Sequence, residues 1–151
     1  MLEERIRDRS AVIAVAGLGY VGLPLACAFA EAGFRVVGLD VQERKTAMVN
    51  RGESYIEDIP SDELKTIVDS GRLTASTDFS LLGEADCVSI CVPTPIDRHS
   101  VPVTTYVSNV AEEVARAMKG MQLVVLESTT YPGTTEEIVL PLLERGGRTV
   151  G

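Results

Sequence analysis

Three glycines, Gly17, Gly19 and Gly22, have the spacing Gly-x-Gly-x-x-Gly, which is suited to binding a dinucleotide. Gly17 lets the chain turn sharply out of a strand. Gly19 has no Cβ, so a pyrophosphate can approach the backbone, and Gly22 lets a helix pack closely on that strand. A helix beginning here offers unpaired N–H groups and a partial positive charge to phosphates. The motif alone is weak evidence for a dinucleotide site, so the predicted elements around it must support this interpretation.

The residues on either side of the glycines have the pattern of a βαβ unit. Residues 11–16 are apolar and rich in β-branched types, as in a buried parallel strand. Residues 23–32 favour a helix, with Pro24 tolerated in its first turn. Residues 34–40 predict a second strand that ends on Asp40, whose carboxylate can accept both hydroxyls of an adenosine ribose. A structural βαβ unit without a ligand is the alternative.

Asp40 also bears on which dinucleotide would bind. Its carboxylate repels the 2′-phosphate of NADP and therefore favours NAD. Arg44 and Lys45 follow closely and could hold a phosphate, so NADP stays open as an alternative.

Two turns that carry hydroxyl groups follow later predicted strands. Pro93-Thr94-Pro95 is a stiff, extended exit from a strand over residues 87–92, and residues 128–133 form a hydroxyl-rich turn after a strand at 122–127. Ligands of doubly wound sheets bind beyond the carboxyl ends of the strands. Hydroxyl groups held there could contact the nicotinamide-side ribose or phosphate, although a plain turn explains the sequence equally well.

The remaining elements follow from hydrophobic periodicity and turn residues. We expect a short helix or a frayed tail at 2–9, and an irregular acidic loop at 53–60. Further helices are expected at 41–50, at 61–70 with Ser61 as its cap, from Thr77 or Asp78, from Thr104 or Thr105 to Lys119, and from Thr134 or Thr135 to Gly146. Further strands are expected at 73–76 and, as the start of a sixth, at 148–151. The alternation predicts one α/β domain: a doubly wound, mainly parallel sheet with helices on both faces.

Composition excludes several classes of protein. The chain has 151 residues, which suits one domain, and a formal net charge of -8, which argues against a nucleic-acid surface. No apolar run reaches the length of a membrane span, and the acids Glu3, Glu4 and Asp8 do not fit a signal peptide, so a cytoplasmic protein is expected.

Cysteine and histidine usage gives no metal or disulfide framework. The three cysteines, Cys27, Cys87 and Cys91, are an odd number, and His99 is the one histidine. We expect the cysteines to be small core residues and His99 to lie in a solvated loop.

Three motifs in this order and spacing, 17–22, Val92-Pro-Thr-Pro95 and 127–134, resemble the N-terminal domain of the UDP-sugar 6-dehydrogenases. The similarity is greatest to the branch that oxidises UDP-N-acetylglucosamine or UDP-N-acetylmannosamine, beside UDP-glucose dehydrogenase. It implies a Rossmann-like fold and, for the full-length enzyme, a homo-oligomer of polysaccharide biosynthesis. That enzyme would oxidise the C6 alcohol of a UDP-sugar to a carboxylate with two NAD, through a thiohemiacetal on a cysteine.

The resemblance also implies cofactor contacts beyond the three glycines. They would come from the backbone of Tyr20 and Val21 at the helix start, from Asp40 and Lys45 at the adenosine end, and from Thr94 and Thr129 at the nicotinamide half. Thr129 would also help to position a water, and its neighbour Thr130 stays open for the nicotinamide contact.

The chain departs from the family pattern where catalysis is concerned. The family's nucleophile lies in a Gly-Gly-x-Cys segment that these 151 residues lack, as they lack its central-helix lysine and asparagine. Val103 stands where the family often has an acid. We therefore expect residues 1–151 to be a cofactor domain, with no catalytic residue, that binds NAD without turnover. A hydroxyacid or 6-phosphogluconate type dehydrogenase, an S-adenosylmethionine methyltransferase and a non-catalytic NAD-binding module are the alternatives.

Overall fold

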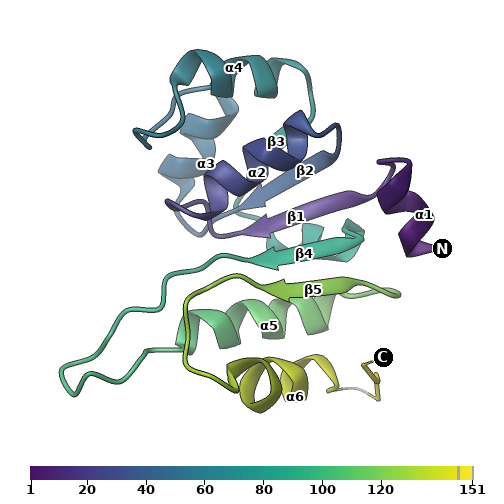
Figure 1. Cartoon of the computed structure of the whole chain (residues 1–151), viewed down its shortest axis with the longest axis vertical. Helices are drawn as coiled ribbons and strands as arrows, with labels where there is room; N and C mark the ends of the chain where they lie inside the picture. The colour runs from purple at the N-terminus through teal and green to yellow at the C-terminus, as the bar shows by residue number, and fades with distance from the viewer. Residues whose placement is uncertain (146, 151) are drawn as a thin grey trace.

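Five parallel strands form one sheet at the centre of the molecule (Figure 1). The computed structural model describes residues 1–145 and 147–150. The strands are β1 Val12–Ala16, β2 Arg35–Leu39, β3 Leu73–Ser76, β4 Cys87–Ile90 and β5 Leu123–Leu126. Their spatial order is β3-β2-β1-β4-β5, so the direction of winding reverses between β1 and β4. All carboxyl ends therefore lie at one edge, where a doubly wound sheet binds ligands beside the reversal.

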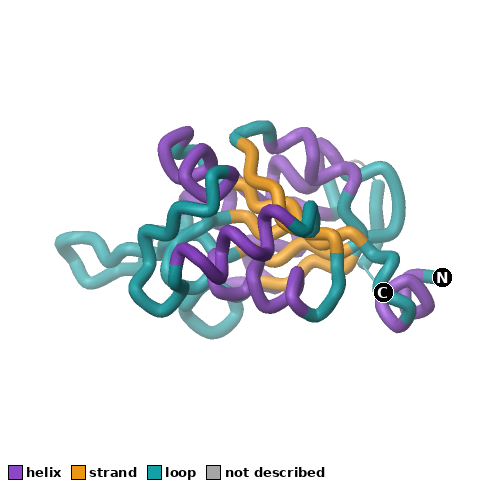
Figure 2. The backbone as a smooth tube through the Cα atoms, turned by 90° about the horizontal axis from the view of Figure 1, so that it is seen from above, coloured by secondary structure: helices purple, strands orange, loops and turns teal. Residues whose placement is uncertain are grey.

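Helices cover both faces of this sheet, which confirms the predicted architecture (Figure 2). On one face lie α2 Gly22–Glu31, α3 Glu43–Asn50 and α4 Ser61–Asp69, whose buried apolar side chains share one core with Ile13 and Val15 of β1. On the other face lie the 3-10 helix η1 Phe79–Glu84, α5 Thr105–Ala117, the π-helical turn η2 Thr135–Val139 and α6 Leu140–Leu143. Alternate residues of β1 enter the two cores, because successive side chains of a strand point to opposite faces.

The amino end of the chain forms a helix, α1 Leu2–Arg7, rather than a frayed tail. Arg5 forms an ion pair with Asp86, the residue that precedes β4. The other carboxylate oxygen of Asp86 accepts the Val12 N–H at 2.7 Å. One buried acid therefore fixes α1 and β1 against the amino end of β4.

Several local predictions differ from the structure, among them the end of the last helix, which is α6 ending at Leu143 and not at Gly146. Ser61 does not cap α4: Pro60 is the N-cap, and the Ser61 hydroxyl accepts the Ser54 N–H at 3.0 Å, which closes the preceding loop instead. β4 ends at Ile90 rather than at Val92: the Cys91 N–H still donates to the Ala16 carbonyl at 2.7 Å, but within the described residues the Val92 N–H makes no such bond, and Pro93 has no N–H. Residues 148–150 form no strand, and Gly146 and Gly151 lie outside the described residues.

The three cysteines are free and serve the core, as expected. Cys27 and Cys91 are buried, and burial raises the pKa of each thiol to about 11. Within the described residues no cluster of His, Cys, Asp and Glu could hold a metal ion. No helix in the described part of the chain is both long and apolar enough to cross a membrane.

Candidate functional site

The glycine turn between β1 and α2 has the tight geometry that its sequence predicts. Gly17 has φ +99°, a conformation that favours glycine, and its N–H donates to the Leu39 carbonyl at 2.7 Å. A Cβ on Gly22 would lie 1.7 Å from the Gly17 carbonyl oxygen, which no side chain could tolerate. The start of α2 therefore packs directly on the end of β1.

The next part of the turn is open. A Cβ built on Gly19 would meet no protein atom within 4 Å, and the side chains of Tyr20 and Val21 are 80% and 58% exposed. Among the described residues, the N–H groups of Gly19, Tyr20 and Val21 have no hydrogen-bond partner within the protein. Such donors at a helix N-terminus, together with the helix dipole, form a cradle for an anion.

Asp40 lies directly beside this cradle and is 7% exposed. Its Oδ2 accepts the Leu18 N–H at 3.0 Å, and its Oδ1 accepts the Gln42 N–H at 2.9 Å. The Lys45 ammonium lies 3.5 Å from Oδ2. These donors hold the carboxylate at the end of β2 and join it to the glycine turn, so the acid and the anion cradle form one unit.

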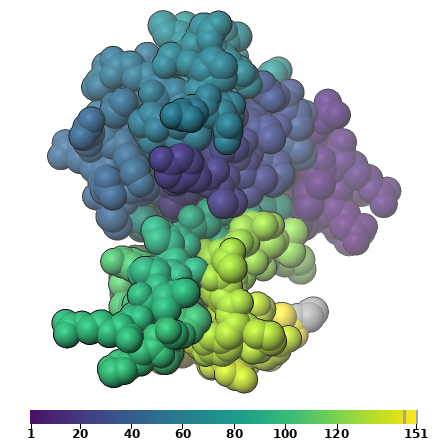
Figure 3. All heavy atoms as spheres, turned by 60° about the vertical axis from the view of Figure 1, so that its left-hand side comes forward, coloured from purple at the N-terminus to yellow at the C-terminus, as the bar shows by residue number. Residues whose placement is uncertain are grey.

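A continuous crevice follows the carboxyl edge of the sheet on both sides of this unit (Figure 3). We call its two parts the large cleft, of about 1070 Å³, and the glycine-turn hollow, of about 520 Å³. The two parts share five lining residues: Gly17, Asp40, Lys45, Val92 and Pro93. The crevice therefore suits an elongated ligand that crosses the glycine turn at its middle.

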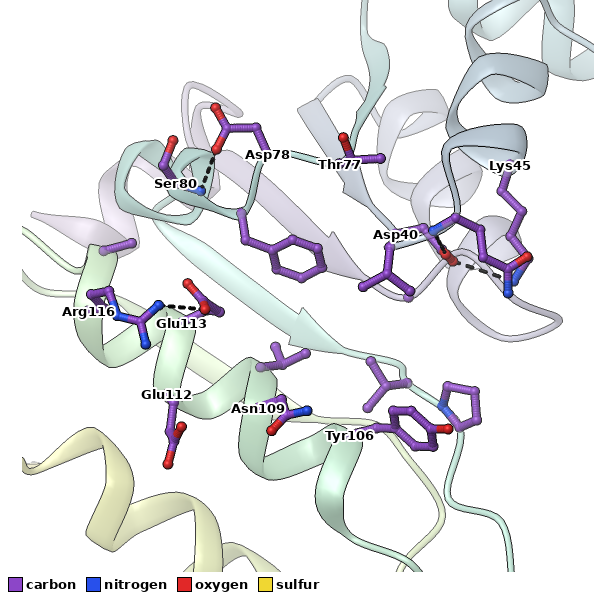
Figure 4. A pocket seen from close by; sticks show the side chains of 18 of the residues that line it. Asp40, Lys45, Thr77, Asp78, Ser80, Tyr106, Asn109, Glu112, Glu113 and Arg116 are labelled. Atoms are coloured by element: carbon purple, nitrogen blue, oxygen red, sulfur yellow. Dashed lines mark hydrogen bonds and ion pairs between the residues drawn. The ribbon is translucent and has the colours of Figure 1, made fainter.

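The large cleft runs between the start of η1 and helix α5 (Figure 4). Asp40 lies towards one end of it, opposite Tyr106 and Asn109 of α5, and the Glu113–Arg116 ion pair lies towards the other. Val41, Phe79 and Val92 contribute apolar surface. A flat apolar ring with polar edges suits the part of this cleft nearest Asp40.

The glycine-turn hollow extends to the loops after β4 and β5. The Thr94 hydroxyl donates to the Thr129 carbonyl, so the two turns predicted from sequence meet each other. Thr129 lines the hollow, whereas Thr130 is not part of its wall. Cys91 also lines it, but with a pKa raised by burial the thiol stays protonated at neutral pH and is no ready nucleophile.

The structure brings together nearly all of the predicted cofactor residues. Those that line the glycine-turn hollow are Gly17, Gly19, Tyr20, Val21, Asp40, Lys45, Thr94 and Thr129. Gly22 lies behind the wall, where it permits the close packing of α2.

Several wall residues were missed by sequence reasoning. Tyr55 and Ile56 reach the hollow from an irregular loop that has no periodicity to interpret. Tyr106 and Asn109 of α5 line the large cleft. Both are exposed and alternate in sequence with the buried apolar residues of α5, so only the position of the helix beside the crevice singles them out.

A dinucleotide fits these residues. The open space at Gly19 leaves room for a diphosphate, the partnerless N–H groups supply donors for it, and a carboxylate lies beside them for a ribose diol. The large cleft and the glycine-turn hollow, which differ in their lining, then remain for the two ends of the ligand.

Comparison with known proteins agrees with this geometry. Residues 11–150 match the NAD binding domain of the UDP-glucose/GDP-mannose dehydrogenase family. UDP-N-acetyl-D-mannosamine dehydrogenase of Escherichia coli (strain K12) is 42% identical over 135 residues, which are 89% of this chain and 31% of that protein. This chain thus spans about a third of the length of the curated relatives that it matches.

Two solved structures are similar over most of the chain. NDP-N-acetyl-D-galactosaminuronic acid dehydrogenase from Methanosarcina mazei Go1 has a TM-score of 0.86 and 33% identity, over 99% of this chain and 34% of that chain. GDP-mannose dehydrogenase from Pseudomonas aeruginosa, in a ternary complex, has a TM-score of 0.83 and 34% identity, over 87% of this chain and 31% of that chain.

The matches confirm the resemblance that the three sequence motifs predict, and the family model is one for NAD, in agreement with the acid at the end of β2. The chain belongs to the UDP-glucose/GDP-mannose dehydrogenase family, of which it is an NAD-binding domain.

Proposed function

We propose that residues 1–151 are the N-terminal cofactor domain of a longer enzyme, an NAD-dependent UDP-sugar 6-dehydrogenase. That enzyme oxidises the C6 alcohol of a UDP-sugar to a carboxylate in two successive NAD-dependent steps. The domain by itself binds NAD and turns nothing over. The observation that carries the proposal is the crevice that crosses the glycine turn, with open N–H donors and Asp40 at its middle.

Each part of the crevice has a role in this proposal. The N–H groups of Gly19, Tyr20 and Val21 bind the diphosphate, and Asp40 binds the adenosine ribose, with Lys45 beside it. Bound NAD supplies the acceptor for the hydride that leaves C6 of the sugar. Thr94 and Thr129, which line the glycine-turn hollow, bind its nicotinamide half.

The sugar and the nucleophile belong to parts of the longer enzyme beyond this domain. The 151 residues contain no Gly-Gly-x-Cys segment, and the buried thiols of Cys27 and Cys91, with pKa values of about 11, are protonated at neutral pH. The relatives with substrate names are about three times as long. We propose a cytoplasmic homo-oligomer as the whole protein, and free cysteines suit that reducing compartment.

Isothermal titration calorimetry of the 151-residue chain with NAD, NADP and ADP-ribose tests the binding half of the proposal. NAD should bind, more tightly than NADP, while a panel of UDP-sugars with NAD should give no NADH absorbance. Absence of NAD binding, or measurable oxidation of a UDP-sugar by these residues alone, would overturn it. The longer protein, assayed with the same panel, should reduce two NAD for each sugar.

A further inference from the structure

Tyr55 reaches the glycine turn from a distant loop. It belongs to the irregular segment between α3 and α4, and its hydroxyl donates to the Leu18 carbonyl at 2.6 Å across 37 residues of sequence. Tyr55 also lines the glycine-turn hollow. No function given to the site so far uses this contact.

The acceptor of that hydrogen bond belongs to the peptide group that joins Leu18 to Gly19, and Gly19 lines the glycine-turn hollow. The carbonyl of Leu18 and the N–H of Gly19 are the two ends of one planar trans peptide, so they point in opposite directions. Fixing the carbonyl therefore fixes the direction of the Gly19 N–H, which is one of the donors that have no partner within the described protein.

Other contacts hold the residues on either side of this peptide without binding the Leu18 carbonyl: the Gly19 carbonyl accepts the Leu23 N–H at 3.1 Å, and two contacts hold Leu18 itself. The Leu18 N–H donates to Asp40, and the Leu18 side chain is fully buried against Gly38, where a Cβ would lie 2.8 Å from Leu18 Cδ2. The two contacts of Leu18 lie on the amino side of its Cα–C bond, so they do not restrain rotation about that bond. The rotation about that bond, which sets the Leu18–Gly19 peptide, is opposed by the Tyr55 hydroxyl.

The ring of Tyr55 lies near Lys45, the cationic side chain beside Asp40. The Lys45 ammonium lies 6.0 Å from the ring centroid, at the outer limit of a cation–π contact, and 3.5 Å from Asp40 Oδ2. Burial, and then the charge of Asp40, raise the pKa of the Tyr55 hydroxyl well above its usual range. The hydroxyl therefore stays protonated, and able to donate a hydrogen bond, at neutral pH.

We propose that Tyr55 is a positioning residue for the dinucleotide site: its hydroxyl holds the Leu18–Gly19 peptide so that the Gly19 N–H faces the diphosphate. This inference rests on the proposed function of the crevice. It makes the loop between α3 and α4 part of the cofactor site, although that loop lies outside the βαβ unit that carries the glycine motif.

The variant Tyr55→Phe tests the role of the hydroxyl while keeping the ring. Affinities for ADP-ribose, which has the diphosphate, and for adenosine, which has no phosphate, are measured by calorimetry and NMR titration. We expect about three- to tenfold weaker binding of ADP-ribose and of NAD, because one orienting hydrogen bond is lost, and unchanged binding of adenosine. Tyr131→Phe is the matched control, since Tyr131 lines neither part of the crevice and its hydroxyl has no hydrogen bond in the described structure.

The outcomes separate this inference from the proposal beneath it. If the unmodified chain binds no NAD, the proposed function fails and takes this inference with it. If the unmodified chain binds and Tyr55→Phe binds ADP-ribose equally well, only the inference fails. Equal weakening for adenosine and ADP-ribose would show a merely structural role and would overturn it as well.

NMR relaxation provides a readout without any ligand. In Tyr55→Phe, the backbone order parameters of residues 18–21 should fall below those of the unmodified chain, because the Leu18–Gly19 peptide is less restrained, while those of β1 and β4 should stay the same. Unchanged order parameters at residues 18–21 would contradict the proposed restraint, even where the variant is less stable than the parent.

Discussion

Replacing Gly19 with alanine should separate cofactor binding from folding. The structure leaves the added Cβ no protein atom within 4 Å, and Gly19 is not among the glycines with positive φ. The fold should therefore accept alanine, with a change in unfolding free energy between zero and about 1 kcal/mol in its favour, because alanine restricts the unfolded chain. The same methyl group occupies the space where the diphosphate approaches the backbone.

The expected loss of affinity follows from the donors that this methyl group displaces. A hydrogen bond to a charged acceptor contributes about 1.5–3 kcal/mol, so pushing the diphosphate away from even one N–H weakens NAD binding about ten- to hundredfold. Gly22→Ala is the contrasting variant, because its methyl group should disturb the fold itself. Its Cβ would lie 1.7 Å from the Gly17 carbonyl oxygen, whereas ordinary contact begins at 3.4 Å, so the turn must open by about 1.7 Å.

Such overpacking costs about 1–3 kcal/mol or more, which lowers Tm by roughly 2–12 °C for a chain of this length. Calorimetric titration with NAD and thermal melts of the two variants beside the unmodified chain provide the test. Gly19→Ala should keep its Tm and lose affinity, while Gly22→Ala should lose both. Full NAD affinity in Gly19→Ala, or a large fall in its Tm, would refute the assignment of the open turn as the diphosphate cradle.

Three further substitutions test other parts of the structure. Asp40→Asn offers one oxygen where the carboxylate accepts two N–H groups, so we expect about 1–3 kcal/mol of lost stability, weaker NAD binding and a smaller preference for NAD over NADP; equal titrations for variant and parent would count against the ribose contact. Burial raises the pKa of the Cys27 thiol from 9.0 to about 11, so its contribution to stability is fully present below pH 9 and is lost as the pH rises towards 11; urea melts of Cys27→Ala at pH 8 and pH 10.5 should therefore show a smaller pH effect than the parent. Asn50→Ala removes two hydrogen bonds of 2.8 Å to the backbone of Ala75 in the edge strand β3, and we expect a loss of about 1–2 kcal/mol by chemical denaturation, with NAD affinity unchanged; an unaltered denaturation midpoint would show that this side chain does not hold β3.

Much of the fold could be predicted from local pattern. The strand β3 Leu73–Ser76 was predicted with its observed bounds, and the other strands differ at their ends by one or two residues. The predicted cap at Ser61 was wrong because a hydroxyl that can cap a helix can equally accept an N–H from elsewhere, here Ser54. Sequence spacing does not distinguish between these partners.

The sequence by itself determined the glycine turn and the acid at the end of β2. These features depend on residues within about 30 positions of each other, where backbone preferences and hydrophobic periodicity act directly. Only the tertiary structure decided that Thr94 meets Thr129, and that Tyr55 holds the Leu18 carbonyl. Those contacts join segments that have no periodicity of their own. Thr94 and Thr129 meet because the parallel strands β4 and β5 end at one common edge.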